Sequence, residues 1–163
     1  MLTMDGPKII EINARFGDPE AMNVLPLLET DFIDICKAML DGNLNKKKLQ
    51  MKKKSTVCKY VVPEGYGVKS MAGKKVIVDE ESIKNTGSQL FYASVNKDND
   101  HVLTTTSRSL AVVGVADKIN NAENICEEAL KHVQSDHIFI RHDIGTPELI
   151  ERRITNMNKL RGI

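Results

Sequence analysis

The sequence of 163 residues contains no tryptophan, and aromatic residues make up only 4% of it. A surface that stacks nucleic-acid bases needs several exposed aromatic side chains, so we do not expect such a surface here. Basic and acidic residues number 23 and 22, which gives a formal net charge of +1 and no electrostatic case for a nucleic acid as partner. No apolar run approaches the ~18 residues of a membrane span, so we expect no membrane partner either.

Cysteine is also scarce. Cys36, Cys58 and Cys126 are widely separated and form no CxxC pair. This pattern excludes a disulfide framework and favours cysteines that pack as small apolar side chains. Unpaired cysteines are typical of a reducing compartment, so we expect a cytoplasmic protein. The four histidines lack the His-x₃-His spacing of a zinc site. Hydrophobic residues at 41% and charged residues at 28% are typical of a globular protein of one ordinary domain or two small ones.

The beginning of the chain has the pattern of a strand followed by a helix. Residues 7–15 predict a strand because apolar and polar residues alternate strictly from Ile10 onward. One face carries apolar side chains, and the other carries the polar side chains of Glu11, Asn13 and Arg15. A turn follows, in which Asp18 is expected to cap a helix that begins at Pro19.

A run of six lysines within residues 43–54 separates two parts of the chain, which we predict as domains of residues 1–48 and 49–163. The lysines are interrupted and lack aromatic neighbours, so a solvated linker is favoured over a nucleic-acid site. Apolar periodicity predicts a first-domain helix over 32–40 and, in the second domain, helices over 122–132 and 147–160 and strands over 56–62, 75–78, 90–95, 101–105, 109–115 and 138–141. These elements predict an α/β (α+β) fold.

The sharpest chemical feature is the spacing of Glu11, Asn13 and Arg15. In a strand, side chains two residues apart lie on one face at a separation of about 6.5 to 7 Å. Carboxylate and amide oxygens are the ligands that Mg²⁺ prefers, and an arginine beside them can hold a carboxylate or phosphoryl group through two hydrogen bonds. The alternation alone favours the exposed polar face of an edge strand, and a metal or phosphate site stays open as the other interpretation at this point.

The wider string around these residues resembles a known family. Residues 5–22, and Arg15-Phe16-Gly17-Asp18-Pro19-Glu20 in particular, resemble the end of the ATP-grasp domain of phosphoribosylamine–glycine ligases. The pattern Glu11-x-Asn13-x-Arg15 is similar to one shared more widely among ATP-grasp ligases. The similarity continues at residues 25–31 and, more loosely, at residues 63–66, 108–115 and 138–145.

The resemblance implies a fold and an activity. The fold would be the end of an ATP-grasp domain followed by a small mixed C-terminal domain of antiparallel strands with a helix. The activity would be the purine-biosynthetic ligation of glycine to 5-phosphoribosylamine, driven by ATP through a glycyl phosphate. Glu11 would bridge two Mg²⁺ or Mn²⁺ ions, Asn13 would ligate one of them, and Arg15 would stabilise the acyl phosphate or the carboxylate being activated. For Asp18, the resemblance adds a substrate contact as an alternative to the helix cap.

Complete members of this family are more than twice as long, and their front part binds phosphoribosylamine and ATP. The 163 residues contain no glycine-rich phosphate loop. We therefore expect a C-terminal portion, which is a fragment, a cloned domain or one half of a split enzyme with a separate N-terminal chain. Such a portion is expected to be inactive alone. The alternative is a non-catalytic interaction or regulatory module that derives from the ligase.

Overall fold

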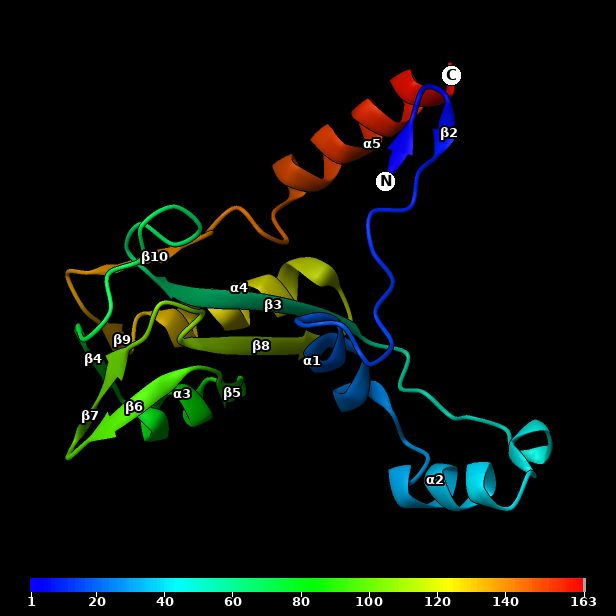
Figure 1. Ribbon diagram of the computed structural model, residues 1–163, viewed down its shortest axis with the longest axis horizontal. Helices are drawn as coiled ribbons and strands as arrows, with labels where there is room; N and C mark the ends of the chain where they lie inside the picture. The colour runs from blue at the N-terminus through cyan, green and yellow to red at the C-terminus, as the bar shows by residue number, and fades with distance from the viewer. Residues whose placement is uncertain (163) are drawn as a thin grey trace.

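The computed structural model describes residues 1–162 and contains two antiparallel four-stranded sheets with helices packed around them (Figure 1). The larger sheet has the order β10 (Ile138–Ile140), β3 (Ser55–Pro63), β8 (Leu110–Ala116) and β5 (Gln89–Tyr92). The smaller sheet has the order β6 (Val95–Asp98), β7 (His101–Thr104), β4 (Lys75–Val78) and β9 (Val133–Gln134). The α+β class predicted from the sequence is confirmed.

The core lies on both sides of the central strands β3 and β8. Because side chains alternate along a strand, Val57 and Val61 face helix α4 (Ile119–Leu130), where they join the main apolar cluster. Cys58, between them in the chain, lies on the opposite face in a second cluster, against which Met22 of helix α1 (Glu20–Val24) packs. The larger sheet is thus covered on both faces, by α4 on one and by α1 on the other.

Gly114 of β8 sets the distance between the larger sheet and α4. A Cβ atom at this position would collide with the backbone carbonyl of Ala122, which a side-chain movement cannot relieve. The absence of a side chain therefore lets the helix backbone approach the strand directly. Its amide also donates to the Cys126 Sγ at 3.1 Å, and this thiol in turn donates to the Val57 carbonyl, also at 3.1 Å.

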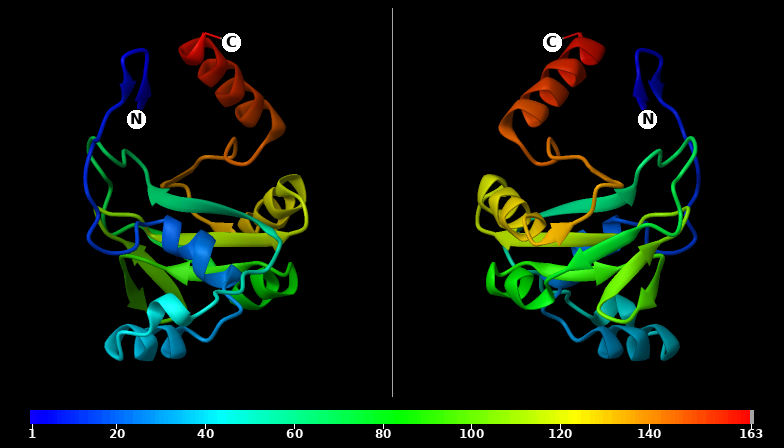
Figure 2. Two further views of the ribbon diagram at one scale, coloured as in Figure 1. Left: turned by 90° about the vertical axis from the view of Figure 1, so that its right-hand side faces the viewer. Right: turned by 90° about the vertical axis from the view of Figure 1, so that its left-hand side faces the viewer.

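Three segments lie outside this two-sheet body. Helix α5 (Pro147–Arg161) extends away from the sheets and contacts the N-terminal hairpin of β1 (Leu2–Thr3) and β2 (Gly6–Pro7), as Figure 2 shows. Helix α2 (Phe32–Leu40) projects from another side of the body. The lysine-rich residues 47–54 carry only one isolated bridge, between Met51 and Leu28.

Single 3₁₀ turns flank α2: η1 (Leu25–Leu27) precedes it and η2 (Leu44–Lys46) follows it. None of the helices within residues 1–162 is long and apolar enough to cross a membrane.

Several predicted elements occur with nearly the expected bounds. These are α2, β3, β4, β7, β8, β10 and α5, and α4 begins and ends slightly earlier than predicted. The predicted strand over 90–95 ends at Tyr92, because the chain turns there before β6. Helix α3 (Glu80–Asn85) was not predicted; Asp79 accepts a hydrogen bond from the Ser82 amide at 3.0 Å as its cap, and Ile83 is its buried residue.

The strand predicted over residues 7–15 is wrong for this chain. Beyond Pro7 the segment has no regular structure, and Ile9, Ile10 and Ile12 are 83%, 71% and 86% exposed. The physical reason is that a strand requires a neighbour to pair its backbone groups, and no part of residues 1–162 lies in ladder register with this segment. The apolar and polar residues alternate, but no strand within residues 1–162 pairs with the segment beyond Pro7.

Candidate functional site

The exposed N-terminal segment carries the residues that the sequence predicted as metal ligands. Asn13 Nδ2 donates a hydrogen bond to Glu11 Oε1 at 3.2 Å, so the two polar side chains lie together although no strand forms. Arg15 makes a separate contact, because its Nη1 donates to the Phe16 carbonyl oxygen at 2.8 Å. The structure therefore brings Glu11 and Asn13 together and holds the Arg15 guanidinium on the following turn.

The donor set of Glu11 and Asn13 suits part of a site for a hard divalent cation. Carboxylate and amide oxygens match the preference of Mg²⁺ and Mn²⁺, and Mg²⁺ commonly takes only one or two protein groups alongside waters and phosphate oxygens. Within residues 1–162, no group of three or more His, Cys, Asp or Glu side chains is placed to hold a metal ion. The two residues thus fit as a partial ligand set.

Asp18 is bound by two side chains of the two-sheet body, and we name Asp18, Tyr60 and Arg108 the Asp18 clamp. The Tyr60 hydroxyl on β3 donates to Asp18 Oδ1 at 2.5 Å. Arg108, which precedes β8, lies 3.3 Å from Asp18 Oδ2 through Nη2 and donates from Nη1 to the Asp18 carbonyl at 3.1 Å. The Arg108 guanidinium also lies over the Tyr60 ring, 4.9 Å from its centroid.

The Asp18 clamp corrects the sequence-based role of Asp18. Helix α1 begins at Glu20, not at Pro19, and no side chain caps it. Because the Asp18 carboxylate is held by Tyr60 and Arg108, it anchors the Arg15–Glu20 turn to the body instead of capping the helix. Neither partner could be found from spacing, since Tyr60 is 42 residues and Arg108 is 90 residues away along the chain.

Burial and the negative charge of Asp18 change the pKa values of the groups at and beside the Asp18 clamp. Burial, together with the hydrogen bond to Asp18, raises the pKa of the Tyr60 phenol above its usual value. Burial also raises the pKa of the neighbouring Cys58 thiol to about 12. Tyr60 therefore stays a hydrogen-bond donor at neutral pH, and Cys58 stays a protonated apolar side chain rather than a nucleophile.

A second polar cluster lies within the body, on the α4 side of the larger sheet. Lys59 is completely buried, and its ammonium contacts Glu123 Oε1 at 2.6 Å, Glu127 Oε1 at 2.5 Å and the His142 carbonyl at 2.7 Å. We name these four residues the Lys59 network. Its three acceptors match the three protons of an ammonium group, so the buried charge is fully hydrogen-bonded. The network could not be predicted from the sequence, because a lone lysine in an apolar strand gives no signal of its partners.

The Lys59 network continues to the segment before α5. His142 Nδ1 lies 2.9 Å from Glu127 Oε2. Burial raises the pKa of Glu127, but the hydrogen bonds from Lys59 and His142 outweigh it, so the pKa is below its ordinary value. Arg141 and Asp143 form an ion pair in the same segment, with two parallel hydrogen bonds of 2.6 and 2.7 Å.

Comparisons with known proteins agree with this architecture. Residues 56–147 match the family model described as "Phosphoribosylglycinamide synthetase, C domain". The chain is 53% identical over 161 residues to a phosphoribosylamine–glycine ligase of Methanocaldococcus jannaschii, and equally so to one of Methanothermobacter thermautotrophicus. In both cases the match covers 99% of this chain but 36% of the relative, so the chain spans about a third of the relatives' length.

A solved structure shows the same fold. The crystal structure of a phosphoribosylamine–glycine ligase from Thermotoga maritima superimposes with a TM-score of 0.68 and 23% identity, covering 88% of this chain and 34% of that one. At this identity the likeness concerns the fold alone. The family follows from the C-domain match and the archaeal relatives: the chain belongs to the phosphoribosylamine–glycine ligase family, also called the phosphoribosylglycinamide synthetases.

Proposed function

We propose that this chain supplies the metal-binding segment and the C-terminal domain of an ATP-dependent ligase that joins glycine to 5-phosphoribosylamine. The observation that carries the proposal is the exposed Glu11–Asn13 pair, joined at 3.2 Å, immediately before the Arg15–Glu20 turn. The names of the relatives, at about half identity over nearly the whole chain, support the same activity.

Glu11 and Asn13 would hold Mg²⁺ or Mn²⁺ through their side-chain oxygens. Such an ion supplies neutralisation of phosphate charge, which is a principal requirement of phosphoryl transfer from ATP. The chain's own contribution is to keep a carboxylate and an amide oxygen adjacent and open to solvent. Glu11 carries the only formal negative charge of the pair, so its removal affects metal binding more than removal of Asn13.

Arg15 is proposed to bind the group that is activated. In the reaction, the glycine carboxylate attacks the γ-phosphate of ATP and gives glycyl phosphate and ADP. The amine of phosphoribosylamine then displaces phosphate to give glycinamide ribonucleotide. A guanidinium can hold a carboxylate or an acyl phosphate through two hydrogen bonds, and Arg15 is released for this by giving up one hydrogen bond to the Phe16 carbonyl.

Asp18 is proposed to act by position. The Asp18 clamp fixes the turn that follows Arg15 against the body, with contacts of 2.5 Å to Tyr60 and 3.3 Å to Arg108. Holding reacting groups in place is the main contribution of a protein to reactions of this type. A direct substrate contact by Asp18 would require the carboxylate to leave both partners.

The remaining ligands and the ATP site are proposed to come from a front part, on this polypeptide or on a separate chain. The three exposed isoleucines, Ile9, Ile10 and Ile12, form an apolar stretch whose backbone groups make no backbone hydrogen bonds within residues 1–162. Such a stretch is suited to strand addition at the edge of another sheet. Pairing there would convert the predicted alternation into an ordered strand and aim Glu11 and Asn13 at one side.

The experiment reconstitutes the ligase from two chains at neutral pH, with a reducing agent and MgCl₂. The 163-residue chain is assayed for glycine- and phosphoribosylamine-dependent ADP release, alone and with the front two thirds of the Methanocaldococcus jannaschii relative. We expect no activity alone and activity in the mixture. Glu11→Gln is expected to abolish this activity, whereas Glu81→Gln, at an exposed position of α3, leaves it unchanged.

Two results would count against the proposal. Ligase turnover by the 163-residue chain alone would contradict the need for a front part. An unchanged rate in the Glu11→Gln mixture would remove Glu11 from the metal site. Binding to the front part without any ADP release would instead favour the alternative function, a non-catalytic interaction or regulatory module.

A further inference from the structure

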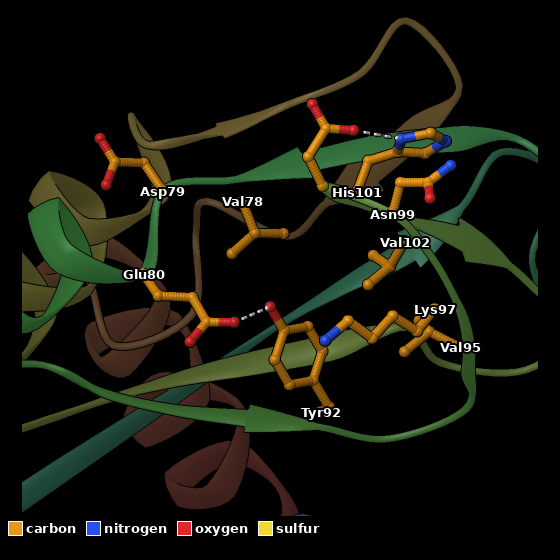
Figure 3. A pocket seen from close by; sticks show the side chains of 10 residues that line it. Val78, Asp79, Glu80, Tyr92, Val95, Lys97, Asn99, His101 and Val102 are labelled. Atoms are coloured by element: carbon orange, nitrogen blue, oxygen red, sulfur yellow. Dashed lines mark hydrogen bonds and ion pairs between the residues drawn. The ribbon is translucent and has the colours of Figure 1, made fainter.

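A cavity of about 500 Å³ lies in the smaller sheet, between the start of α3 and the β6–β7 hairpin (Figure 3). Its volume falls in the range of small-molecule sites. It is remote from the Glu11–Asn13 segment, which runs along the other side of the molecule (Figure 1). Neither the proposed ligase chemistry nor the Asp18 clamp uses any of its residues.

The floor of the cavity is apolar. Val78 of β4, Val95 of β6 and Val102 of β7 line it, and all three also belong to or pack against the main apolar cluster. Because Val102 is only 9% exposed, this floor is a rigid part of the core rather than a mobile surface. Burial of apolar ligand surface against this floor is favourable, because it removes that surface from water. The floor therefore favours a ligand with an apolar side chain.

Some polar groups of the cavity already have a hydrogen-bond or ion-pair partner, and others have none among residues 1–162. The Tyr92 hydroxyl donates to Glu80 Oε1 at 2.8 Å, which leaves Glu80 Oε2 without a partner among residues 1–162. No carboxylate of the described residues lies within 4.0 Å of the Lys97 ammonium, and the Lys97 side chain points toward the Tyr92 ring in Figure 3. One free ammonium and one free carboxylate oxygen therefore border the same cavity.

The other charged groups of the cavity are already engaged. Asp79 accepts from the Ser82 amide and hydroxyl at 3.0 and 2.7 Å. The His101 ring is held between Asp98 at 3.4 Å and Asp100 at 3.0 Å. Counting these groups, carboxylates exceed ammonium groups at the rim, which opposes a ligand carrying two negative charges.

We propose that this cavity binds a small zwitterion with an apolar side chain, of the class of branched or aromatic α-amino acids. The ligand carboxylate pairs with Lys97, the ligand ammonium donates to Glu80 Oε2, and the side chain lies on the three valines. A zwitterion matches one free cation and one free anion, and its zero net charge suits the acidic rim. The Tyr92 ring provides an additional flat surface for the side chain.

The test is a titration of the 163-residue chain with L-leucine and L-phenylalanine, followed by amide chemical shifts. We expect saturable shifts at Val78, Val95 and Val102, with a dissociation constant of roughly 1 mM or lower. Lys97→Met and Glu80→Gln are each expected to weaken binding by roughly tenfold or more, the usual cost of losing a charged hydrogen bond. Lys84→Met, an exposed lysine of α3 outside the cavity, is the matched control and leaves binding unchanged.

Further arms separate the proposed ligand class from other ligands. Glycine has the same charged groups without an apolar body, so weaker binding than leucine supports the role of the valine floor. Adenosine monophosphate serves as the dianionic probe, and tighter binding than leucine would overturn the charge assignment. Absence of saturable shifts at roughly 10 mM amino acid would overturn the proposal. The amide spectra also show whether each variant is folded, and no outcome depends on ligase activity.

Discussion

The two-sheet body buries a core of apolar side chains, whereas the N-terminal region leaves most of its apolar side chains exposed. In the body, β8 is so well covered that Leu110 through Val113 are fully buried. Among the first 54 residues only Ile35 and Ala38 of α2 are buried, and Ile10 and Ile12 are largely exposed. The body therefore makes its own core, whereas the region with the predicted chemistry leaves most of its apolar side chains exposed.

Charged residues show the same contrast. Lys59 in the body is surrounded by three acceptors and has no access to water. Glu11 in the N-terminal segment has one hydrogen bond, to Asn13, and is exposed. A buried charge that is fully paired serves the fold, while an exposed and adaptable oxygen pair is available to a ligand. We therefore expect the buried charges to contribute to the stability of the fold and the exposed pair to contribute to function. The following substitutions test this contrast.

The largest effect on stability is expected from Lys59→Met. The substitution leaves Glu123 and Glu127 close together and without their shared cation, which costs about 3–5 kcal/mol for a buried pair. The free energy of unfolding is measured by urea titration. Lys54→Met is the matched control, because its ion pair with Asp117 is exposed and is worth at most about 1 kcal/mol. Equal effects of the two variants would show that the buried network is not the stabilising one.

The Lys59 network also predicts a dependence of stability on pH. The folded-state pKa of Glu127 is lowered, so its contribution is complete above the ordinary carboxyl pKa of about 4.3 and is lost as the pH falls through the folded-state value. Glu127→Gln removes this contribution at neutral pH. We expect the unfolding free energies of the two proteins to differ at pH 7 and to converge toward pH 3. A constant difference over this range would contradict the assignment.

A smaller effect is expected where the N-terminal region meets the body. Tyr60→Phe removes the hydrogen bond to Asp18, which contributes about 1 kcal/mol. Hydrogen exchange of the amides of Ala21, Met22 and Asn23, which donate to the Gly17 and Pro19 carbonyls, is expected to become faster, because the Asp18 clamp loses one of its two side chains. Tyr92→Phe is the matched control, since that hydroxyl bonds Glu80, which does not belong to the Asp18 clamp. Unchanged exchange in Tyr60→Phe would leave Arg108 as the sole anchor.

The smallest effect on the isolated chain is expected from Ile12→Ser. The side chain is 86% exposed, so the free energy of unfolding should change by no more than about 0.5 kcal/mol. The same substitution is expected to weaken association with the front part of a relative, because Ile12 belongs to the stretch proposed to pair there. Association is measured by calorimetry, and equal affinity of the two proteins would show that the stretch is not the contact surface.

The sequence predicted the body better than the N-terminal region. The strands β3 and β8 and the helix α4 were found from periodicity, because they bury the faces that their patterns mark. Helix α5 was also predicted, although Leu149 is its only buried residue. The strand over residues 7–15 was predicted from an equally clear alternation and is absent, because alternation describes a segment and not its partner. Helix α3 was missed because it is short and contributes a single buried residue, Ile83.

The candidate site was predicted in part. The spacing of Glu11 and Asn13 predicted that their side chains lie together, and the structure brings them together, whereas their role as metal ligands stays a prediction. The partners of Asp18 and of Lys59 come from distant parts of the chain, so only the fold could reveal them. The expected helix cap at Asp18 failed for this reason, since local propensity was outweighed by Tyr60 and Arg108.

We propose that the Glu11–Asn13 segment forms a paired strand only against a front part of the ligase. The decisive measurement is hydrogen exchange of the amides of residues 9–17, for the 163-residue chain with and without the front part of the Methanocaldococcus jannaschii relative. We expect fast exchange alone and strong, alternating protection in the mixture, as a paired strand requires. Equally fast exchange in a mixture that has formed a complex would contradict the claim.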